Sequence, residues 1–285
     1  MGYDDQRINW KIRTKFKLSS GPVASGYPQA LMPYPVYSIV IPAYNETRRI
    51  PATLNAVVSW IRAKRLSAEV VVVNDGSRDR TGEVVRAFAE GAPEVRLVEN
   101  PGNRGKGYSV RHGMLEALGE VVMFTDADLS APMEEAQGLF DAIAEGADIA
   151  IGSRWLESTR QTTRQPLYRQ FFGRCFNLVT RAVMRLPFAD TQCGFKAFTR
   201  TAAQTVFQLQ TIEGWGFDPE ILFIALKRGL RIKEVPVSWA HDERTQMSYL
   251  EDGARMLQDL AHVRWNALRG RYDRKVEDVQ RGRVA

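Results

Sequence analysis

The sequence predicts an α/β fold: a doubly wound, mostly parallel β-sheet flanked by helices, with a helical extension at its C-terminal end. Three runs, at 37–41, 69–73 and 121–124, are near-continuously apolar, as strands buried on both faces are. Between the runs, apolar residues recur at steps of three and four, which is the spacing of amphipathic helices. Strands that alternate with helices favour right-handed crossovers and therefore parallel neighbours.

The first run leads into five residues that we place at the end of a strand. They are Pro42, Ala43, Tyr44, Asn45 and Glu46. In a doubly wound sheet ligands bind outside the carboxyl ends of the strands, so this segment is a candidate part of a binding site. A helix should follow it, because one helical face carries Ile50, Leu54, Val57, Val58 and Ile61.

The second run ends in Asn74, Asp75, Gly76 and Ser77. If the sheet is parallel, Asp75 lies at the same edge as the end of the first run. An Asp-Gly-Ser sequence is also common in plain turns that cap a helix, so the motif alone leaves both interpretations open.

A glycine-rich segment at 100–109 carries two positive side chains, Arg104 and Lys106. Glycines let backbone N–H groups approach an anion, and the start of the helix that follows adds a partial positive charge. This combination favours a phosphate group as the ligand. The alternative is a glycine-rich turn with solvated basic residues.

The third run ends in Thr125-Asp126-Ala127-Asp128. In an extended segment residues i and i+2 point to the same side, so Asp126 and Asp128 can face one point. Two carboxylates placed in this way repel each other unless a cation lies between them, and a hard divalent cation with oxygen ligands is the usual one. We therefore expect a divalent cation that keeps open positions for a nucleotide diphosphate.

These segments carry a family resemblance. Ile-Pro-Ala-Tyr-Asn-Glu, Val-Asn-Asp-Gly-Ser, Asn-Arg-Gly-Lys-Gly and Asp-Ala-Asp, in this order, resemble family 2 of the inverting GT-A glycosyltransferases over about 36–154. Two later segments, 190–196 and 215–220, closely resemble the dolichyl-phosphate β-glucosyltransferases. The resemblance implies a GT-A fold and the transfer of a sugar, with glucose as the first choice, from a UDP-sugar to a polyprenyl phosphate of the dolichyl type.

The resemblance also implies roles for individual residues. Mg²⁺ or Mn²⁺ would bind the UDP diphosphate through Asp126 and Asp128. The set that binds the donor comprises Pro42, Ala43, Tyr44, Asn45, Glu46, Asp75, Arg104, Lys106 and Asp126. The catalytic set, which includes the acceptor side, comprises Asp128, Asp190, Gln192, Lys196 and Asp218.

A phosphate acceptor changes what the site must supply. Its second pKa of about 6 leaves it largely ionised at neutral pH, so it needs little or no general base. We therefore expect Asp190 and Asp218 to position the substrates, whereas a hydroxyl acceptor would need one of them as a base. Transfer to a soluble or another lipid acceptor, and a non-catalytic module that binds a nucleotide sugar or anionic lipid, are the alternatives.

Basic residues are concentrated beside an aromatic helical pattern. The chain has a formal net charge of +6, and residues 154–185 contain seven Arg and a single acid, Glu157. An aromatic helical face edged by Arg is typical of a helix at a membrane interface, and a helix that faces the core is the alternative. The face comprises Tyr168, Phe171, Phe172, Cys175, Leu178, Val179, Ala182, Val183 and Leu186. The candidates for binding a lipid phosphate are Arg154, Arg164, Arg169 and Arg174.

We divide the chain into three parts: an N-terminal arm (1–35), a catalytic domain (36–245), and a C-terminal amphipathic helix with a basic tail (246–285). The domain has a nucleotide-sugar half (36–154) and an acceptor half (155–245). The C-terminal helix either packs on the domain or lies on a membrane, and its wide apolar face favours packing. That face includes Leu250, Leu257, Leu260, Ala261, Trp265 and Leu268.

Composition limits the cellular setting. Only two cysteines, Cys175 and Cys193, occur in 285 residues, which fits a reducing compartment and gives no disulfide framework. No stretch approaches the ~20 apolar residues that a membrane-spanning helix needs. We expect a cytoplasmic protein in peripheral contact with the anionic cytoplasmic face of a membrane. The pI of about 9.4 also allows nucleic acid, but no recognised nucleic-acid motif is present, so we expect no such partner.

Overall fold

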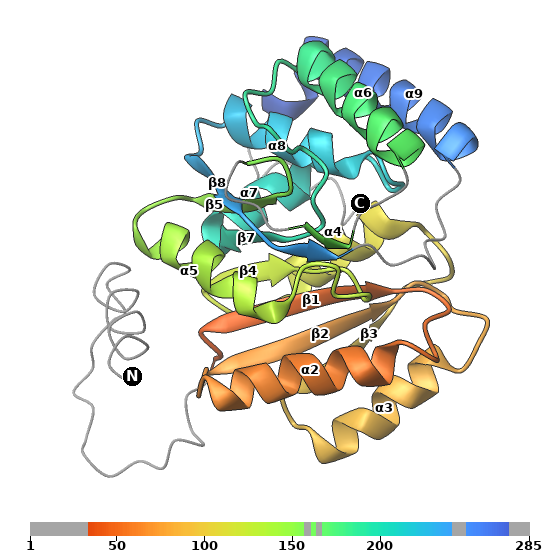
Figure 1. Ribbon diagram of the computed structural model, residues 1–285, viewed down its shortest axis with the longest axis vertical. Coiled ribbons are helices and arrows are strands. Elements are labelled where there is room, and N and C mark those ends of the chain that lie inside the picture. The colour runs from red at the N-terminus through yellow and green to blue at the C-terminus, as the bar shows by residue number, and fades with distance from the viewer. Residues whose placement is uncertain (1–33, 157–160, 164–166, 241–248, 274–285) are drawn as a thin grey trace.

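A computed structural model describes residues 34–156, 161–163, 167–240 and 249–273 of the chain, and these residues form a layered α/β structure (Figure 1). The N-terminal arm up to residue 33, the candidate Arg164 and the basic tail from residue 274 lie outside the described residues. For Arg169 the helix is described but not the side chain.

The central sheet has seven strands in the order β3-β2-β1-β4-β7-β5-β8. Every neighbouring pair is parallel except the two that involve β7, which confirms the predicted doubly wound, mostly parallel sheet. A second, two-stranded sheet pairs β6 (Gln161–Thr163) with β9 (Trp239–Ala240). The strands of the central sheet are β1 (Tyr37–Ala43), β2 (Ala68–Asn74), β3 (Val95–Glu99), β4 (Val121–Phe124), β5 (Ile149–Ser153), β7 (Lys196–Thr199) and β8 (Ile232–Pro236).

Helices cover both faces of this sheet (Figure 1). One face packs on α2 (Ile50–Ala63), α3 (Thr81–Gly91) and α5 (Ala136–Ala144), with a short 3-10 helix, η2 (Met133–Glu135), before α5. The other face packs on α4 (Lys106–Glu116), α7 (Arg200–Leu209) and α8 (Phe217–Lys227). Two further helices, α6 (Leu167–Met184) and α9 (Tyr249–Leu268), contact each other and lie beyond α8, and η3 (Arg271–Asp273) follows α9.

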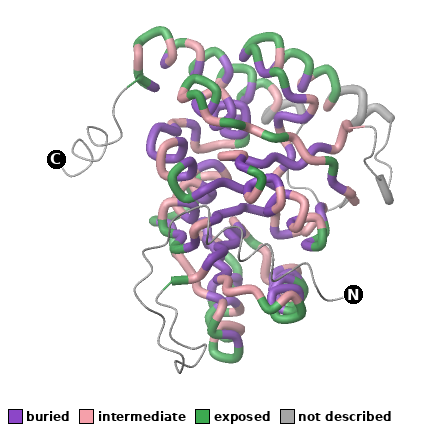
Figure 2. The backbone as a smooth tube through the Cα atoms, turned by 90° about the vertical axis from the view of Figure 1, so that its left-hand side faces the viewer, coloured by how far each residue is buried: buried purple, intermediate pink, exposed green. Residues whose placement is uncertain are grey.

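Burial explains why the strands are near-continuously apolar. Within β1, Ile39 and Ile41 pack under α2, whereas Val40 between them packs toward α4, and all three are fully buried. Successive side chains of a strand point to opposite faces, so a strand with helices on both faces needs an apolar residue at every position. Figure 2 shows the buried residues concentrated along the strands and the inner faces of the helices.

The two outermost helices turn much of their apolar surface outward. Helix α6 buries Asn177, Thr180 and Met184, while Leu178 and Val179 are 65% and 42% exposed. The apolar stripe of α6 therefore does not face the core. None of the helices in the described part of the chain is long and apolar enough to cross a bilayer.

Helix α9 carries two apolar faces. One packs on the domain through Met256, Leu260 and Val263, which are buried. The other face is open, and Trp265 and Leu268 on it are 53% and 79% exposed. Most of the residues that define the apolar stripe in the sequence, such as Leu257 and Trp265, therefore lie on the open face rather than on the packed one.

Candidate active site

The carboxyl ends of β1, β2 and β4 meet at one edge of the sheet, together with the amino end of the antiparallel β7. The ends of β1 and β2 are tied together there. The backbone N–H of Asp75 donates to the carbonyl of Ala43 at 2.9 Å, and the N–H of Asn45 donates to the Ser77 hydroxyl at 3.0 Å. The N–H of Glu46 donates to the Thr81 hydroxyl at 2.8 Å. These bonds hold residues 43–46 beside Asp75, as expected for one binding rim.

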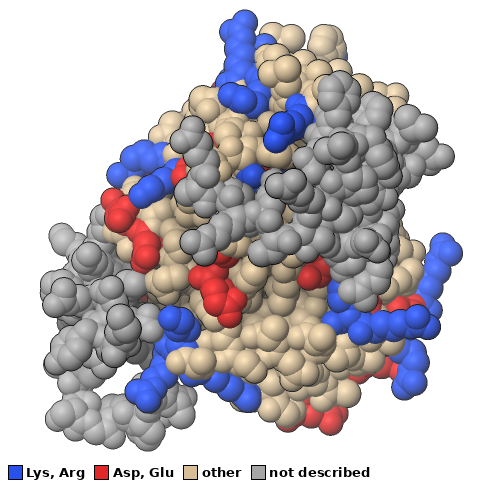
Figure 3. Space-filling view, viewed as in Figure 1, with Lys and Arg blue, Asp and Glu red and all other residues tan. Residues whose placement is uncertain are grey.

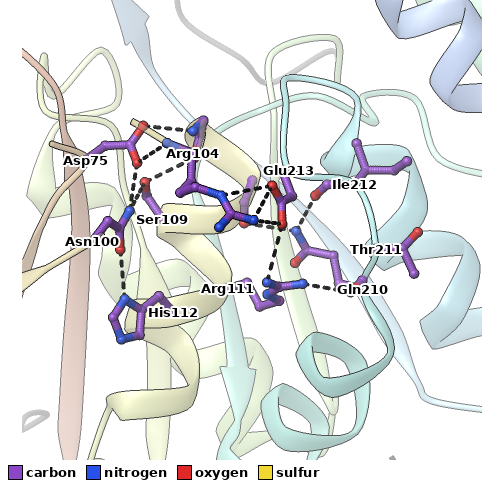
Figure 4. A network of polar contacts seen from close by, with 12 residues as sticks. Asp75, Asn100, Arg104, Ser109, Arg111, His112, Gln210, Thr211, Ile212 and Glu213 are labelled. Carbon is purple, nitrogen blue, oxygen red and sulfur yellow. Dashed lines mark hydrogen bonds and ion pairs between the residues drawn. The ribbon is translucent and has the colours of Figure 1, made fainter. Parts of the chain in front are cut away.

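The Asp75 carboxylate organises the glycine-rich segment (Figure 4). It accepts hydrogen bonds from the Asn100 side chain at 2.7 Å and from the backbone N–H groups of Arg104 and Gly105 at 2.9 and 2.8 Å. His112 fixes Asn100 in turn, through a 2.7 Å contact between its Nδ1 and the Asn100 Oδ1. A carboxylate offers about four acceptor positions, so Asp75 retains one for a ligand.

The Arg104 guanidinium is engaged with another part of the chain. It forms hydrogen bonds of 2.9 and 3.0 Å with the two carboxylate oxygens of Glu213, and it lies 4.7 Å from the centre of the Tyr108 ring. Figure 4 shows Glu213 between Arg104 and Arg111. The expected contact between Arg104 and the donor therefore stays a prediction, and sequence patterns gave no indication of Glu213.

Lys106, the first residue of α4, reaches the end of β4. Its Nζ lies 2.6 Å from Oδ1 of Asp126. Burial alone would lower the pKa of Lys106, but the Asp126 and Asp218 carboxylates outweigh it and leave that pKa above its ordinary value. Lys106 is therefore cationic at neutral pH.

Asp128 is the second carboxylate of the pair. Burial raises its pKa, and the negative charge of Asp126 raises it further, while a 2.9 Å hydrogen bond from the N–H of Ser130 works in the opposite direction. Gly194 lies directly against the Asp126 carboxylate, and a Cβ at that position would overlap the carboxylate oxygens. Asp126 thus contacts Lys106 and also lies against the backbone at Gly194.

Asp126 and Asp128 fit a hard divalent cation. Their ligand atoms are carboxylate oxygens, and both causes that raise the pKa of Asp128, burial first and the charge of Asp126 second, are ones that a bound cation offsets. Among the described residues, no group of three or more His, Cys, Asp or Glu could hold a metal ion by itself. A cation at this pair would therefore take its remaining ligands from water and a bound diphosphate, as Mg²⁺ often does.

Lys196 and Asp218 form a buried ion pair beside this pair of carboxylates. Lys196 lies opposite Phe124, the last residue of β4, and its Nζ donates to Asp218 at 2.5 Å and to the Cys193 carbonyl at 2.6 Å. Burial raises the pKa of Asp218, although Lys196 and Lys106 both oppose that shift. We call Lys106, Asp126, Lys196 and Asp218 the charged cluster.

Asp190 is held by Arg154 at the end of β5. The guanidinium donates to the two Asp190 oxygens at 2.6 and 2.9 Å, and the Arg154 N–H adds a bond of 3.0 Å. Burial would raise the pKa of Asp190, but Arg154 outweighs burial and keeps it below the ordinary value. Two residues further on, the side-chain Nε2 of Gln192 is buried with no hydrogen-bond partner within the described part of the chain.

The basic candidates for the lipid phosphate are not alike. Arg154 is partly buried and pairs with Asp190, so its contact with a lipid phosphate stays a prediction. Arg174 is exposed on α6, with its guanidinium 5.0 Å from the centre of the Trp155 ring. Arg164 and the side chain of Arg169 lie outside what the structure describes.

Comparison with known proteins shows what this chain is similar to. Residues 38–207 match the model of the family described as glycosyl transferase family 2. The chain is 37% identical over 248 residues to a dolichyl-phosphate beta-glucosyltransferase of Trichomonas vaginalis, covering 83% of this chain and 72% of that protein. It is 34% identical to the enzyme of that name from Saccharomyces cerevisiae and 32% identical to the one from Homo sapiens; each alignment covers 82% of this chain and 76% of the relative.

Solved structures show the same fold. Glucosyl-3-phosphoglycerate synthase from Mycobacterium tuberculosis superposes with a TM-score of 0.60 at 20% identity, covering 90% of this chain and 87% of that one. Mannosyl-3-phosphoglycerate synthase from Rubrobacter xylanophilus superposes with a TM-score of 0.63 at 16% identity, covering 85% and 76%. With the rim motifs in place and the family model matching more than half of its length, the chain belongs to glycosyl transferase family 2.

Proposed function

We propose that the chain transfers glucose from UDP-glucose to a polyprenyl phosphate of the dolichyl type, with inversion at the anomeric carbon and with Mg²⁺ or Mn²⁺ at Asp126 and Asp128. The observation that carries this proposal is the charged cluster at the rim. Lys106 contacts Asp126, which follows β4, and the carboxylate of Asp218, the buried partner of Lys196, helps to raise the pKa of Lys106. The names of the relatives support glucose as the sugar and dolichyl phosphate as the acceptor.

The solved relatives support the donor and the cation. Glucosyl-3-phosphoglycerate synthase from Mycobacterium tuberculosis has been crystallised with Mn²⁺ and UDP-glucose, and also with Mg²⁺ and UDP. The two carboxylates follow a central strand, and the cationic Lys106 contacts one of them, Asp126. This arrangement suits a diphosphate whose negative charge a divalent cation partly neutralises.

The chemistry places specific demands on the rim. When the bond between the anomeric carbon and the diphosphate oxygen breaks, negative charge builds on UDP. A divalent cation at the Asp pair would stabilise that charge, and the cationic Nζ of Lys106 lies beside the same carboxylate. An ionised acceptor phosphate can attack without losing a proton. A positioning role for Asp190 fits this, because its lowered pKa makes it a weak base.

We further propose that the open faces of α6 and α9 bring the enzyme to the anionic cytoplasmic face of a membrane, where a lipid acceptor resides. Contiguous exposed apolar side chains mark interaction sites, and these two neighbouring helices expose Leu178, Val179, Val183, Leu257, Trp265 and Leu268. The upper end of the molecule, where α6 and α9 lie in Figure 1, shows Lys and Arg beside uncharged surface in Figure 3. Basic and apolar surface together suit anionic headgroups.

The test is UDP release from UDP-glucose with Mn²⁺ or Mg²⁺, in the presence and absence of a short polyprenyl phosphate. We expect release that depends on the lipid and on the metal, is lost in Asp128→Asn, and yields a β-linked lipid-phosphate glucose. Release that does not depend on the lipid would keep the donor and redirect the search to other acceptors. Absence of metal-dependent UDP-glucose binding would overturn the donor assignment.

A further inference from the structure

Glu220, in the first turn of α8, is a fully buried carboxylate outside the charged cluster. It accepts hydrogen bonds from the backbone N–H groups of Thr211 and Ile212 at 2.9 and 2.8 Å and from the Thr211 hydroxyl at 2.7 Å. A fourth donor is the hydroxyl of Tyr272, at 2.7 Å, which is also fully buried. Four donors converging on one carboxylate fix the backbone at Thr211 and Ile212.

Those two residues belong to the segment from Gln210 to Gly216, which we call the bridging segment. Its other side lies on the glycine-rich segment. The side-chain Nε2 of Gln210 donates to the Gly107 carbonyl at 2.9 Å, and the N–H of Tyr108 donates to the Glu213 carbonyl at 3.0 Å. In Figure 4 the bridging segment lies beside the start of α4, with the Glu213 side chain toward Arg104.

The bridging segment and the glycine-rich segment pack so closely that a side chain would not fit between them. At Gly105 an added Cβ would approach the Glu213 carbonyl oxygen to 2.6 Å, and at Gly107 it would approach the Ile212 carbonyl oxygen to 2.7 Å. Distances this short do not occur for real Cβ atoms, so the two backbones touch directly. A shift of the bridging segment must therefore move the glycine-rich segment or break these contacts.

The bridging segment also reaches the charged cluster. Trp215 lies with its ring centre 5.0 Å from Nζ of Lys106, and α8 with Asp218 begins two residues later. Tyr272 comes from η3, which follows α9, so the C-terminal part of the chain contacts Glu220, the residue that holds the bridging segment. Asn266 of α9 adds a 3.2 Å hydrogen bond to the Thr211 hydroxyl.

We propose that Glu220 is a positioning residue for donor binding. It acts through the backbone of Thr211 and Ile212 on Glu213 and Trp215, which form one wall beside the glycine-rich segment, and Tyr272 holds Glu220 in place. This inference rests on the UDP-sugar donor proposed above. It gives the C-terminal helix and η3 a role in the donor site.

The test compares Glu220→Gln and Tyr272→Phe with the wild-type chain. Gln has nearly the same volume, but its amide NH₂ would face one or two of the four donors and leave them unsatisfied. We expect the Kd for UDP in the presence of Mn²⁺, measured by calorimetry, to rise about tenfold or more in Glu220→Gln. The rise should be smaller in Tyr272→Phe, because three donors remain.

Glu69→Gln is the matched control. The Glu69 carboxylate is also buried and accepts from the Ser38 hydroxyl, the Leu118 N–H and Arg96, but it lies at the opposite end of β2 from Asp75. The Glu69→Gln substitution should lower the free energy of unfolding and leave the Kd for UDP unchanged.

Four outcomes would overturn the inference. One is UDP affinity in Glu220→Gln equal to that of the wild type. Another is an equal loss of UDP affinity in Glu69→Gln, which would mean that general destabilisation is the cause. A wild-type chain that fails to bind UDP would overturn the donor assignment itself, and this inference with it. If Glu220→Gln does not fold, Tyr272→Phe decides, because unchanged UDP affinity in that folded variant would overturn the inference.

Discussion

Nζ of Lys106 lies 2.6 Å from Oδ1 of Asp126, so a lysine contacts the carboxylate that we assign to the divalent cation. Two cations cannot share one carboxylate at short range without mutual repulsion. A bound diphosphate would offer Lys106 a different anion and free Asp126 for the metal. This relationship predicts that metal and nucleotide assist each other in binding.

Replacing Lys106 with Met should therefore separate the two ligands. We expect Mn²⁺ alone to bind about fivefold or more tightly, because two carboxylates lose their competing cation, while UDP-glucose turnover falls by about 10² or more. Mn²⁺ binding is followed by electron paramagnetic resonance, and turnover by UDP release. Lys233→Met, which breaks an exposed pair with Glu145, is the control and should change neither. Unchanged Mn²⁺ affinity in Lys106→Met would show that Lys106 does not compete with the metal.

Gly194→Ala should damage the metal site without adding or removing a charge. The added methyl group would overlap the Asp126 carboxylate and force it to move. We expect weaker binding of Mn²⁺ together with UDP, by about tenfold, since a displaced ligand loses its geometry. Gly91→Ala is the control, because a Cβ there would meet nothing within 4 Å. Equal metal affinity in the two variants would contradict the placement of Asp126.

Asp190 should be a stability residue with a defined pH dependence. Its pKa is lowered in the folded chain, so its stabilising contribution is present above the unfolded value of about 3.9 and is lost as pH falls through the folded value. Asp190→Asn would remove the buried carboxylate charge that pairs with Arg154 and should lower the free energy of unfolding by about 3–5 kcal/mol at pH 7.

Urea unfolding between pH 3 and pH 7 measures this dependence. The difference between wild type and Asp190→Asn should shrink as pH falls below about 4, because Asp190 is then protonated in the unfolded chain and still ionised in the folded one. Glu83→Gln, which breaks an exposed pair with Arg80, should leave unfolding nearly unchanged. A difference that stays constant down to pH 3 would contradict the lowered pKa of Asp190 in the folded chain.

The sequence predicted much of the fold for a physical reason. Strands buried on both faces must be apolar at every position, so β1, β2 and β4 are visible as runs, and the residues after them necessarily lie at one edge. Asp75 and Asp126 were placed at that edge by this argument alone. The short β7 was not predicted, because its four residues follow a loop and its antiparallel pairing with β4 and β5 depends on tertiary contacts.

Partners across the site could not be predicted from local patterns. Glu213 lies 109 residues from Arg104, and Arg154 lies 36 residues from Asp190, so no periodicity connects either pair. For α6 and α9 the sequence left two alternatives open, a face that packs on the core and a face that lies open. Helical spacing shows which residues share a face, but it does not show whether that face packs on the core or lies open.

Asp218→Asn tests whether this carboxylate positions groups or takes a proton. It would weaken the 2.5 Å contact with Lys196, and we expect transfer to the lipid phosphate to fall by about tenfold, with a matching rise in the donor KM. A general base contributes about 10²–10⁴ in rate. A loss of that size with an unchanged donor KM would contradict the positioning role. Steady-state kinetics with varied UDP-glucose distinguishes the two results.

The open faces of α6 and α9 should determine binding to anionic vesicles. Leu178→Asp and Trp265→Asp each put a negative charge among exposed apolar and basic side chains, so both the apolar and the electrostatic contributions weaken. We expect each variant to lose about tenfold or more of its binding to phosphatidylserine vesicles in sedimentation, while UDP binding stays at the wild-type level.

Leu118→Asp is the matched control, since Leu118 is 38% exposed but lies near the start of β4, away from both helices. Wild-type binding should also fall as salt increases, because the electrostatic part is screened. Full vesicle binding by Leu178→Asp and Trp265→Asp would contradict membrane docking through these faces. If those variants instead changed a dimer into a monomer, the faces would be an interface between copies of the chain, since an exposed apolar patch serves either purpose.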